Sequence, residues 1–429
     1  MAQAVKDERF YSSKTILAPM VRAGRTPLRL LALEYGADLV YTEEIVDQKL
    51  LNSKRITNDI LHTIDYVLED DVVLRIARKK EEQKCVLQVQ KMIVLVLRGT
   101  DVAAVDINMG CPKPFSLMGG MGAALLTQPD KVKDILTSVV SVSSVPVSCK
   151  IRVLEKREET LELVKLIERC GVSALAVHGR RKDERQANAN RIDEIREIAG
   201  ILSIPVIANG GSGTIKEFAD IERFRLESGA SSVMIARKAL SHPSVFRSNG
   251  LLTMQEEIED FLRLACEFDE NFTMTKYVVQ RILGSQQEFD ERGRATVNAA
   301  SVSDICDAWS MRDVYDECKS DRQRRTVKRK FESVGTDLPT ELAMSPESDI
   351  HFIDLTFPPK RLRNRCGADT PKCVLNALCD ENGMKRPIYT CKLRSTDKRY
   401  EALIEVDGRK FLSRIGQPNK KMAEQVGGG

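Results

Sequence analysis

The chain has 429 residues, which is too many for one simple core, so two or three domains are expected. No apolar run is long enough to cross a membrane and the first residues carry no secretory signal, which favours a cytoplasmic protein without a membrane partner. Eleven Cys without paired spacings suit reduced thiols, and four His without a zinc motif predict no metal site.

The net charge of +4 is unevenly distributed along the chain. Residues 366–429 hold 12 Lys or Arg and 8 Asp or Glu, and residues 321–365 hold 10 and 7, so residues 1–320 carry a small negative charge. A basic C-terminal third favours a polyanionic partner such as nucleic acid. A solvated basic surface explains the charge equally well when charge is considered alone.

Short runs of buried-strand type alternate with amphipathic helical stretches through the first 240 residues. The helical stretches include Thr26–Tyr35, Asp130–Val139, Glu158–Cys170 and Arg191–Ala199. The eight strand-like runs are Thr15–Val21, Leu39–Ile45, Cys85–Gln90, Val102–Met109, Pro146–Val153, Ala174–Arg180, Pro205–Gly211 and Ser232–Leu240. They predict an α/β fold with a TIM (β/α)8 barrel over residues 1–250, rather than an open doubly wound sheet. The eleven-residue connection Lys91–Asp101 is near the minimum for a crossover, so we expect a cramped barrel there.

The remainder of the chain predicts three further segments. Residues 251–320 have a helical apolar pattern and predict a helical domain packed on the barrel. Residues 321–365 combine charge blocks with low hydrophobicity and predict a basic, flexible linker. Residues 366–429 predict a double-stranded-RNA-binding domain, because their pattern has the order α-β-β-β-α. Its elements are a helix over Thr370–Cys379, strands over Pro387–Leu393, Tyr400–Val406 and Lys410–Arg414 joined by a hairpin at Asp407-Gly408, and a helix over Lys420–Val426.

Polar groups follow most of the barrel strands, at the face where TIM barrels carry out their chemistry. Cys111 is the most informative of them, since it follows the buried run Val102–Met109 and precedes a proline. A small core residue is the ordinary explanation of such a cysteine, as a satisfied core residue is for His178. The shared position of these groups at one face of the barrel favours a functional site.

The last two strand ends predict a phosphate site. Asn209-Gly210-Gly211 offers backbone N–H groups, and Arg237 offers a guanidinium that can bind phosphate through two hydrogen bonds. This is where TIM barrels commonly bind phosphate, so a cofactor such as FMN is favoured. Lys150 is placed to stabilise negative charge on a reduced flavin, and Gln88 and His178 to hydrogen-bond its ring.

Several motifs together resemble the tRNA-dihydrouridine synthase family. They are Ala18-Pro19-Met20, Asn108-Met109-Gly110-Cys111-Pro112-Lys113, Gly119-Gly120-Met121-Gly122-Ala123, Cys149-Lys150-Ile151-Arg152, Val177-His178-Gly179-Arg180 and Asn209-Gly210-Gly211. The appended module, which starts near Thr370-Pro371-Lys372, is similar to that of the eukaryotic type that modifies position 20 of the tRNA D-loop. The resemblance covers nearly the whole chain except residues 321–365.

The resemblance implies an oxidoreductase acting on the C5–C6 bond of uridine in the D-arm of tRNA. NADPH or NADH would reduce FMN, the flavin would pass hydride to C6, and Cys111 would protonate C5 as general acid. The FMN-binding residues that it implies are Met20, Val21, Arg22, Glu44, Gln88, Lys150, His178, Asn209, Gly210, Gly211, Ala236 and Arg237. The RNA-binding residues are Asn108, Arg152 and Arg180 in the barrel and Lys372, Lys420 and Lys421 in the C-terminal module.

Two segments depart from the family pattern, and two alternatives remain open. The crossover after Gln88 is shorter than in the family, and the last helix ends early, so weaker binding of FMN and RNA is expected. The segment Gly119–Gly122 predicts a mobile loop over the substrate. Lys276 and Tyr277 are candidates for contact with tRNA, although a solvated lysine beside a core aromatic explains them as well. The alternatives to the family's activity are another FMN barrel acting on a small pyrimidine, and an RNA-binding protein with weak catalysis.

Overall fold

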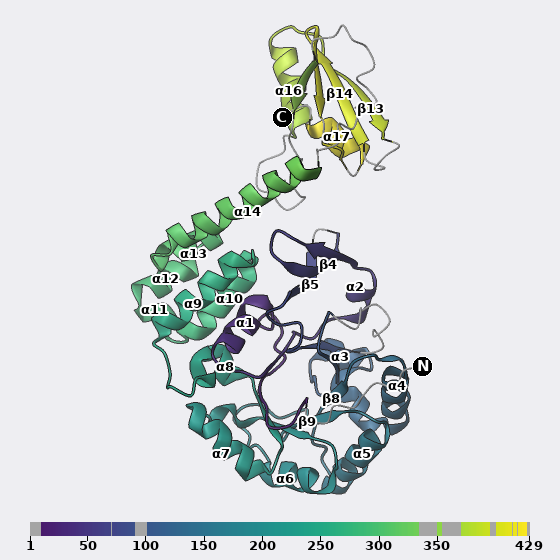
Figure 1. Cartoon of the computed structure of the whole chain (residues 1–429), viewed down its shortest axis with the longest axis vertical. Coiled ribbons are helices and arrows are strands. Elements are labelled where there is room, and N and C mark those ends of the chain that lie inside the picture. The colour runs from purple at the N-terminus through teal and green to yellow at the C-terminus, as the bar shows by residue number, and fades with distance from the viewer. Residues whose placement is uncertain are drawn as a thin grey trace. The chain divides into compact units, whose positions relative to one another are not determined.

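In a computed structural model, the structure describes residues 10–69, 71–90, 101–333, 350–353, 370–394, 400–413, 415–417 and 419–426. The chain divides into two compact units, Met1–Thr326 and Val327–Gly429, and each is described by itself (Figure 1). No helix among these described residues is long and apolar enough to cross a membrane.

Within the described part of the first unit, eight parallel strands close into the predicted TIM barrel, in the order β1-β11-β10-β9-β8-β7-β6-β2. Strands buried on both faces are typical of parallel sheets, and every residue of β6 and β7 is buried. The strands are β1 (Thr15–Leu17), β2 (Leu39–Tyr41), β6 (Cys85–Val89), β7 (Ala104–Asn108), β8 (Val147–Arg152), β9 (Ala174–His178), β10 (Val206–Asn209) and β11 (Ser232–Ile235).

Two apolar clusters separate the inside of the barrel from its outer shell. The smaller cluster fills the interior with side chains such as Ile16, Tyr41, Val86 and Met234. The larger cluster lies between the strands and the surrounding helices. These helices are α1 (Thr26–Glu34), α2 (Asp47–Leu51), α3 (Pro114–Met118), α4 (Pro129–Val142), α5 (Arg157–Arg169), α6 (Ile192–Ile201), α7 (Phe218–Ser228) and α8 (Arg237–Ser241). Helix α5 shows why they form, because it buries Thr160, Leu163, Val164 and Ile167 at helical spacing.

All eight barrel strands are shorter than predicted, and the first and the eighth show the cause. The first was expected to continue to Val21, but β1 ends at Leu17 and Met20 begins a turn instead. The eighth was expected to continue to Leu240, whereas β11 ends at Ile235 and α8 begins at Arg237. The first run passes into a turn and the eighth into a short helix, and sequence periodicity does not separate a strand from either in a short apolar run.

A three-stranded antiparallel sheet, which the sequence analysis did not predict, lies between β2 and β6 in the chain. It consists of β3 (Lys54–Asn58), β4 (Thr63–Leu68) and β5 (Asp71–Ala77). Asp101 anchors this sheet, because its buried carboxylate accepts hydrogen bonds from Arg55 at 2.6 and 2.7 Å and from the Tyr66 hydroxyl at 2.6 Å. The expected cramped crossover falls on residues 91–100, which lie outside the described residues.

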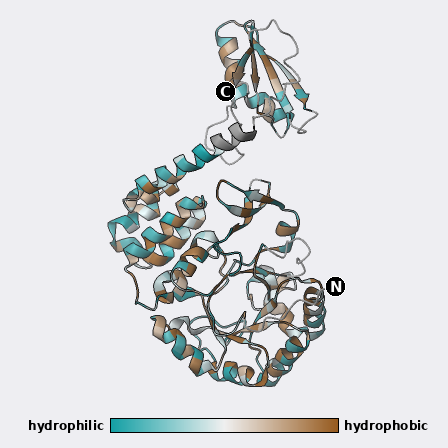
Figure 2. Cartoon of the chain, in the orientation of Figure 1, coloured by the Kyte–Doolittle hydropathy of each residue, from teal (hydrophilic) through white to brown (hydrophobic). Residues whose placement is uncertain are grey.

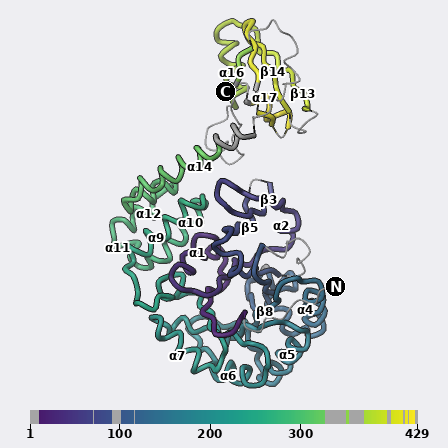
Figure 3. Tube along the Cα trace, in the orientation of Figure 1, coloured from purple at the N-terminus to yellow at the C-terminus, as the bar shows by residue number. Residues whose placement is uncertain are grey.

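The helical region that follows the barrel belongs to the same unit, and its core residues join the larger apolar cluster. It consists of α9 (Met254–Glu267), α10 (Phe272–Leu283), α11 (Gln286–Phe289), α12 (Glu291–Asn298), α13 (Val302–Ala308) and α14 (Arg312–Ser333). Helix α9 packs on α1 (Figure 3). Thr253 and Glu256 cap its N-terminus by reciprocal hydrogen bonds. Helix α14 continues into the expected linker and is largely hydrophilic (Figure 2).

The second unit has the predicted α-β-β-β-α order and one further strand. Helices α16 (Pro371–Glu381) and α17 (Lys420–Val426) accompany β13 (Ile388–Leu393), β14 (Tyr400–Val406) and β15 (Arg409–Ser413). The predicted hairpin is confirmed, with positive φ at both Asp407 and Gly408. The further strand, β12 (Ile350–Ile353), pairs in parallel with β15, although its residues lie in the expected linker.

Candidate active site

A cavity of about 210 Å³ lies at the carboxyl ends of the barrel strands. It brings together most of the barrel residues that the sequence predicted for the site. Those that line it are Val21, Glu44, Gln88, Asn108, Cys111, Lys150, Arg152, His178, Asn209, Gly210, Ala236 and Arg237. Met20, Arg22, Arg180 and Gly211 do not line it.

The turn after β7 holds Cys111 at this cavity. The side-chain oxygen of Asn108 accepts hydrogen bonds from the backbone N–H of Gly110 at 3.0 Å and of Cys111 at 3.1 Å. Such an Asx turn fixes the chain directly after a strand. From β8, Arg152 Nε donates to the Gly110 carbonyl at 2.9 Å. The thiol therefore sits on a turn that is held from its own strand and from the next.

The environment of Cys111 keeps its thiol protonated. Burial raises the pKa of Cys111, and the charge of Glu44 acts in the same direction, although the Ser116 hydroxyl opposes them. A raised thiol pKa disfavours a nucleophilic thiolate and leaves a proton available at neutral pH. The geometry suits a proton donor.

Positive charge dominates the cavity. Burial lowers the pKa of Lys150 to about 8, with Arg152 adding repulsion. Burial and neighbouring arginines likewise lower the pKa of Arg152 to about 10. Glu44 is the one carboxylate among the described residues that line the cavity. One carboxylate does not balance the positive charges of Lys150, Arg152 and Arg237, so the cavity suits an anionic ligand.

His178 is neutral in this setting. Burial, followed by the charges of Lys150 and the nearby arginines, lowers its pKa to about 2. Arg180 Nη1 lies 3.3 Å from His178 Nε2. A guanidinium only donates, so Nε2 accepts and the proton of the neutral ring is on Nδ1. His178 thus offers one N–H donor at the edge of the cavity.

Asp106 lies beneath the cavity, and the sequence analysis did not select it. Its buried carboxylate accepts hydrogen bonds from Gln88 Nε2 at 2.8 Å and from the Ser148 hydroxyl at 2.7 Å. Burial raises its pKa to about 6. Asp106 thereby orients Gln88, whose Oε1 faces the Asn108 amide at 3.4 Å. The available signal was a carboxylate inside an otherwise apolar strand, since a buried charge requires partners.

The loops after β10 and β11 contribute Gly210 and Arg237 to the cavity. Gly210 has φ +108°, and a Cβ there would meet the Asn190 side chain at 2.3 Å, so glycine is required. Arg180 Nη1 donates to the Gly210 carbonyl at 2.9 Å, and Arg180 itself is 6% exposed. Arg180 therefore stabilises the Gly210 loop without lining the cavity, whereas the exposed Arg237 lines it.

Comparisons with known proteins agree with this geometry. Residues 16–332 match the dihydrouridine synthase (Dus) family, and residues 371–426 match the double-stranded RNA binding motif. The chain belongs to the dihydrouridine synthase family.

Relatives within the dihydrouridine synthase family include two yeast proteins named tRNA-dihydrouridine(20) synthase [NAD(P)+]. The chain is 38% identical to that of Schizosaccharomyces pombe over 292 residues, which cover 64% of this chain and 60% of the relative. It is 35% identical to that of Saccharomyces cerevisiae over 307 residues, which cover 65% of this chain and 79% of the relative. A third relative from S. pombe, named tRNA-dihydrouridine(20a/20b) synthase [NAD(P)+], is 28% identical over 299 residues, which cover 68% of this chain and 85% of the relative. The chain thus spans less than two thirds of the first of these relatives.

The remaining barrel residues that the family resemblance singled out lie outside the cavity. Met20 packs partly buried against the larger apolar cluster. Arg22 is exposed, with its guanidinium 5.8 Å from the centre of the Tyr277 ring.

Lys276 of α10, a candidate for contact with tRNA, is not simply solvated, because its Nζ donates to the carbonyls of Val297 and Ala299 at 2.7 and 2.9 Å.

The glycine-rich segment of this dihydrouridine synthase family member packs against Cys111. The Cys111 carbonyl accepts a hydrogen bond from Ala123 N–H at 3.0 Å, and a Cβ at Gly122 would meet that carbonyl oxygen at 2.6 Å. Closure of this loop over a substrate stays a prediction.

In the second unit the three predicted lysines differ in their surroundings. Lys420 and Lys421 are exposed at the start of α17. Lys372 donates to Glu424 Oε2 at 2.7 Å and lies 4.3 Å from the centre of the Tyr389 ring. Part of the charge of Lys372 is therefore already compensated within the unit.

Proposed function

We propose that this protein reduces a uridine of tRNA to 5,6-dihydrouridine, at position 20 of the D-loop. The observation that carries the proposal is a thiol held protonated at a cation-lined cavity, in a dihydrouridine synthase barrel whose chain also has an RNA-binding domain. Saturating the C5–C6 bond of uracil requires a hydride and a proton, and the thiol is a source of the proton.

The residues of the cavity fit FMN as the cofactor. Its phosphate would be held at the Gly210 loop and Arg237, where backbone N–H groups and a guanidinium meet. Lys150 would face negative charge on the flavin ring, and Gln88 and His178 would hydrogen-bond the ring edge. When bound, FMN supplies the hydride that NADPH or NADH provides.

The chain's own residues then bind the base and move one proton. Asn108 and Arg152 would hold the uracil, which must leave its stack in the folded tRNA to reach the cavity. The Sγ–H bond of Cys111 breaks as the C5–H bond forms, and the sulfur is left as a thiolate. The positive charge of Lys150 and Arg152 stabilises that thiolate, since their charges interact favourably with ionised Cys111.

The second unit would hold the tRNA while the barrel acts on it. Lys420 and Lys421 would contact phosphates, as double-stranded-RNA-binding domains recognise shape and backbone rather than sequence. Position 20 is favoured over 20a or 20b because the relatives named for position 20 are 38% and 35% identical, against 27% to 31% for three relatives named for 20a/20b.

The experiment uses the purified full-length protein and a tRNA transcribed without modifications. We expect flavin absorbance in the purified protein, and after incubation with NADPH a mass increase that corresponds to two hydrogens at position 20. Free uridine serves as the control substrate and should not react. A colourless protein that does not bind added FMN, or an unchanged position 20, would contradict the proposal.

A further inference from the structure

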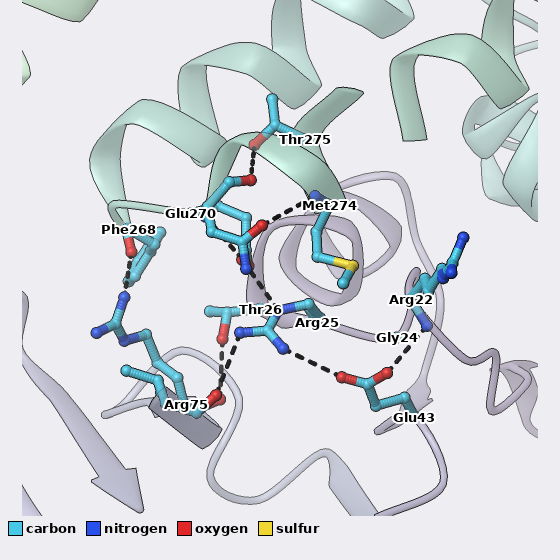
Figure 4. Close-up of polar contacts among 12 residues, drawn as sticks. Arg22, Gly24, Arg25, Thr26, Glu43, Arg75, Phe268, Glu270, Met274 and Thr275 are labelled. Atoms are coloured by element: carbon cyan, nitrogen blue, oxygen red, sulfur yellow. Dashed lines mark hydrogen bonds and ion pairs between the residues drawn. The ribbon is translucent and has the colours of Figure 1, made fainter. Parts of the chain in front are cut away.

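The turn Met20–Arg25, which follows β1, is held by Glu43 at the end of β2. Arg22 has φ +72°, a left-handed conformation that is uncommon for a residue other than glycine. Its backbone N–H donates to Glu43 Oε2 at 2.9 Å, whereas its side chain points away from this carboxylate (Figure 4). The Glu43 N–H donates to the Gly24 carbonyl at 3.1 Å. Glu43 therefore fixes the turn through both its side chain and its backbone.

Arg25 joins this turn to two other regions of the first unit. Its guanidinium lies between two carboxylates, donating to Glu43 Oε1 at 3.2 Å and to Glu270 Oε1 at 2.9 Å (Figure 4). It also donates to the Val72 carbonyl of β5 at 3.4 Å. One cation thus holds the end of β2, the antiparallel sheet and the corner between α9 and α10.

The corner between α9 and α10 is itself well fixed. Glu270 Oε1 also accepts the Asn271 N–H at 2.9 Å, and Arg75 Nη1 donates to the Phe268 carbonyl at 2.5 Å. The Glu270 side chain is 8% exposed, so its ion pair with Arg25 is little screened by water. The corner can therefore act as a support for Arg25.

The cavity beside these groups measures only about 20 Å³, which is room for a water molecule at most. The network is consequently too closed to be a ligand site. Residues next to the network in the chain, in contrast, line the active-site cavity. They are Pro19, directly before the turn, Val21 within it, and Glu44, directly after Glu43.

We infer that Glu43, Arg25 and Glu270 are positioning residues, through which the α9–α10 corner of the helical region sets the place of the Met20–Arg25 turn at the cofactor and substrate cavity. None of the three lines the cavity, so they act through Val21 and Glu44. The part of this inference that concerns the flavin rests on the proposed function.

The first test needs no cofactor and measures backbone hydrogen exchange in the full-length protein. Glu270→Ala removes the support from Arg25, and we expect faster exchange in residues 20–25, which lie about 245 positions away in sequence. Glu34→Ala is the matched control. It also breaks an arginine–carboxylate pair between α9 and the barrel, with Arg263 at 2.7 Å, but it leaves the turn untouched. Unchanged exchange in residues 20–25 of Glu270→Ala would overturn the inference.

The second test measures FMN affinity by flavin fluorescence and the kinetic constants at saturating FMN. We expect Glu43→Ala to raise the Kd for FMN about tenfold, the factor that corresponds to about 1.4 kcal/mol. KM for tRNA should rise while kcat changes less, because the chemical groups remain in place. Glu43→Gln keeps an acceptor oxygen for the Arg22 N–H and should restore most of the affinity.

The outcomes separate the two proposals. A parent protein that binds no FMN would contradict the proposed function, whereas the exchange experiment would still decide the coupling. A parent protein that binds FMN, together with Glu43→Ala and Glu270→Gln variants of equal affinity, would overturn the positioning role. Should Glu43→Ala fail to fold, Glu270→Gln carries the comparison, since it retains the side-chain volume but removes the charge that faces Arg25, and an affinity for FMN equal to that of the parent would overturn the positioning role.

Discussion

At the scale of single residues, the protonation of Cys111 decides what the site can do. We predict that Cys111→Ala lowers turnover of tRNA by about 10²–10⁴-fold, the usual contribution of a general acid, because no other thiol lines the cavity among the described residues. FMN binding should be retained, as judged by the absorbance of the purified variant. Cys170→Ala, which removes a half-buried thiol at the end of α5, is the control. A Cys111→Ala variant as active as the parent would remove Cys111 from this role.

Lys150 should make cofactor binding depend on pH. Its pKa of about 8 lies below the ordinary value of a lysine because of burial and Arg152. An anionic ligand raises that pKa, so binding takes up a proton above pH 8 and affinity is lost as the pH rises through 8. We therefore expect the Kd for FMN to be nearly constant from pH 6.5 to 7.5 and to increase above about pH 8.

The measurement is a series of FMN titrations by fluorescence quenching between about pH 6.5 and pH 9.5. Lys150→Met should bind more weakly and lose this pH dependence, whereas Lys216→Met, at an exposed position outside the cavity, should behave as the parent. A parent affinity that stays constant up to pH 9.5 would contradict the assigned pKa shift.

Most of the cavity residues could be predicted because they lie in the carboxyl-terminal half of a recognisable buried strand or shortly after it. Asp106 could not, since its role depends on the pairing of three strands. The register places Gln88 opposite Asp106 and Asp106 opposite Ser148. That alignment arises only when the barrel closes, and local sequence carries no trace of it. The same holds for the hydrogen bond from Arg180 to the Gly210 carbonyl, whereas a contact of Arg180 with substrate stays a prediction.

At the scale of elements, the barrel strands were predictable and the antiparallel sheet was not. The barrel strands are continuous apolar runs, the pattern of a parallel sheet buried on both faces. Strands β4 and β5 instead alternate apolar residues such as Ile64 and Leu74, which are buried, with the ion-paired Asp65 and Arg75, and β3 is largely exposed, so none of the three is a continuous apolar run. Strand β12 has only four residues among charged neighbours, and its pairing with β15 is long-range in sequence. Composition correctly indicated the low hydrophobicity of these neighbours but could not reveal that pairing.

The anchor of the antiparallel sheet provides a test of stability. We expect Asp101→Ala to lower the free energy of unfolding of the first unit by about 2–3 kcal/mol, because it leaves the Arg55 guanidinium and Tyr66 hydroxyl without this acceptor. Urea unfolding followed by fluorescence of Trp309 is the measurement, since this is the only tryptophan of the chain. Asp59→Ala breaks the exposed pair with Arg78 in the same sheet and should change stability by less than about 0.5 kcal/mol. Equal effects of the two substitutions would argue against an anchoring role of Asp101.

At the scale of the whole molecule, the proposed chemistry and the proposed RNA binding belong to different units. We predict that Lys420→Ala with Lys421→Ala weakens tRNA binding and reduces the dependence of log Kd on log salt by about one for each lost phosphate contact. At saturating tRNA, kcat should stay that of the parent, because neither lysine belongs to the barrel. Filter binding between about 50 and 200 mM salt measures the slope.

Lys385→Ala is the control for that experiment, because Lys385 is an exposed lysine of the second unit that lies outside α17. It should leave the slope close to that of the parent. If the double variant and this control had the same salt dependence, the RNA contact would have to be assigned to another surface of the second unit.

The backbone of Gly24 lies directly against that of Glu43, and this contact bears on the interpretation of natural variants of the gene. A Cβ on Gly24 would lie 2.5 Å from the backbone nitrogen of Glu43, a distance that neither segment can accommodate without moving. Every missense change of a glycine codon adds at least that one carbon. Gly24 does not line the cavity, so a variant there would look harmless when judged by distance from the chemistry. It should nevertheless be classed with loss-of-function alleles.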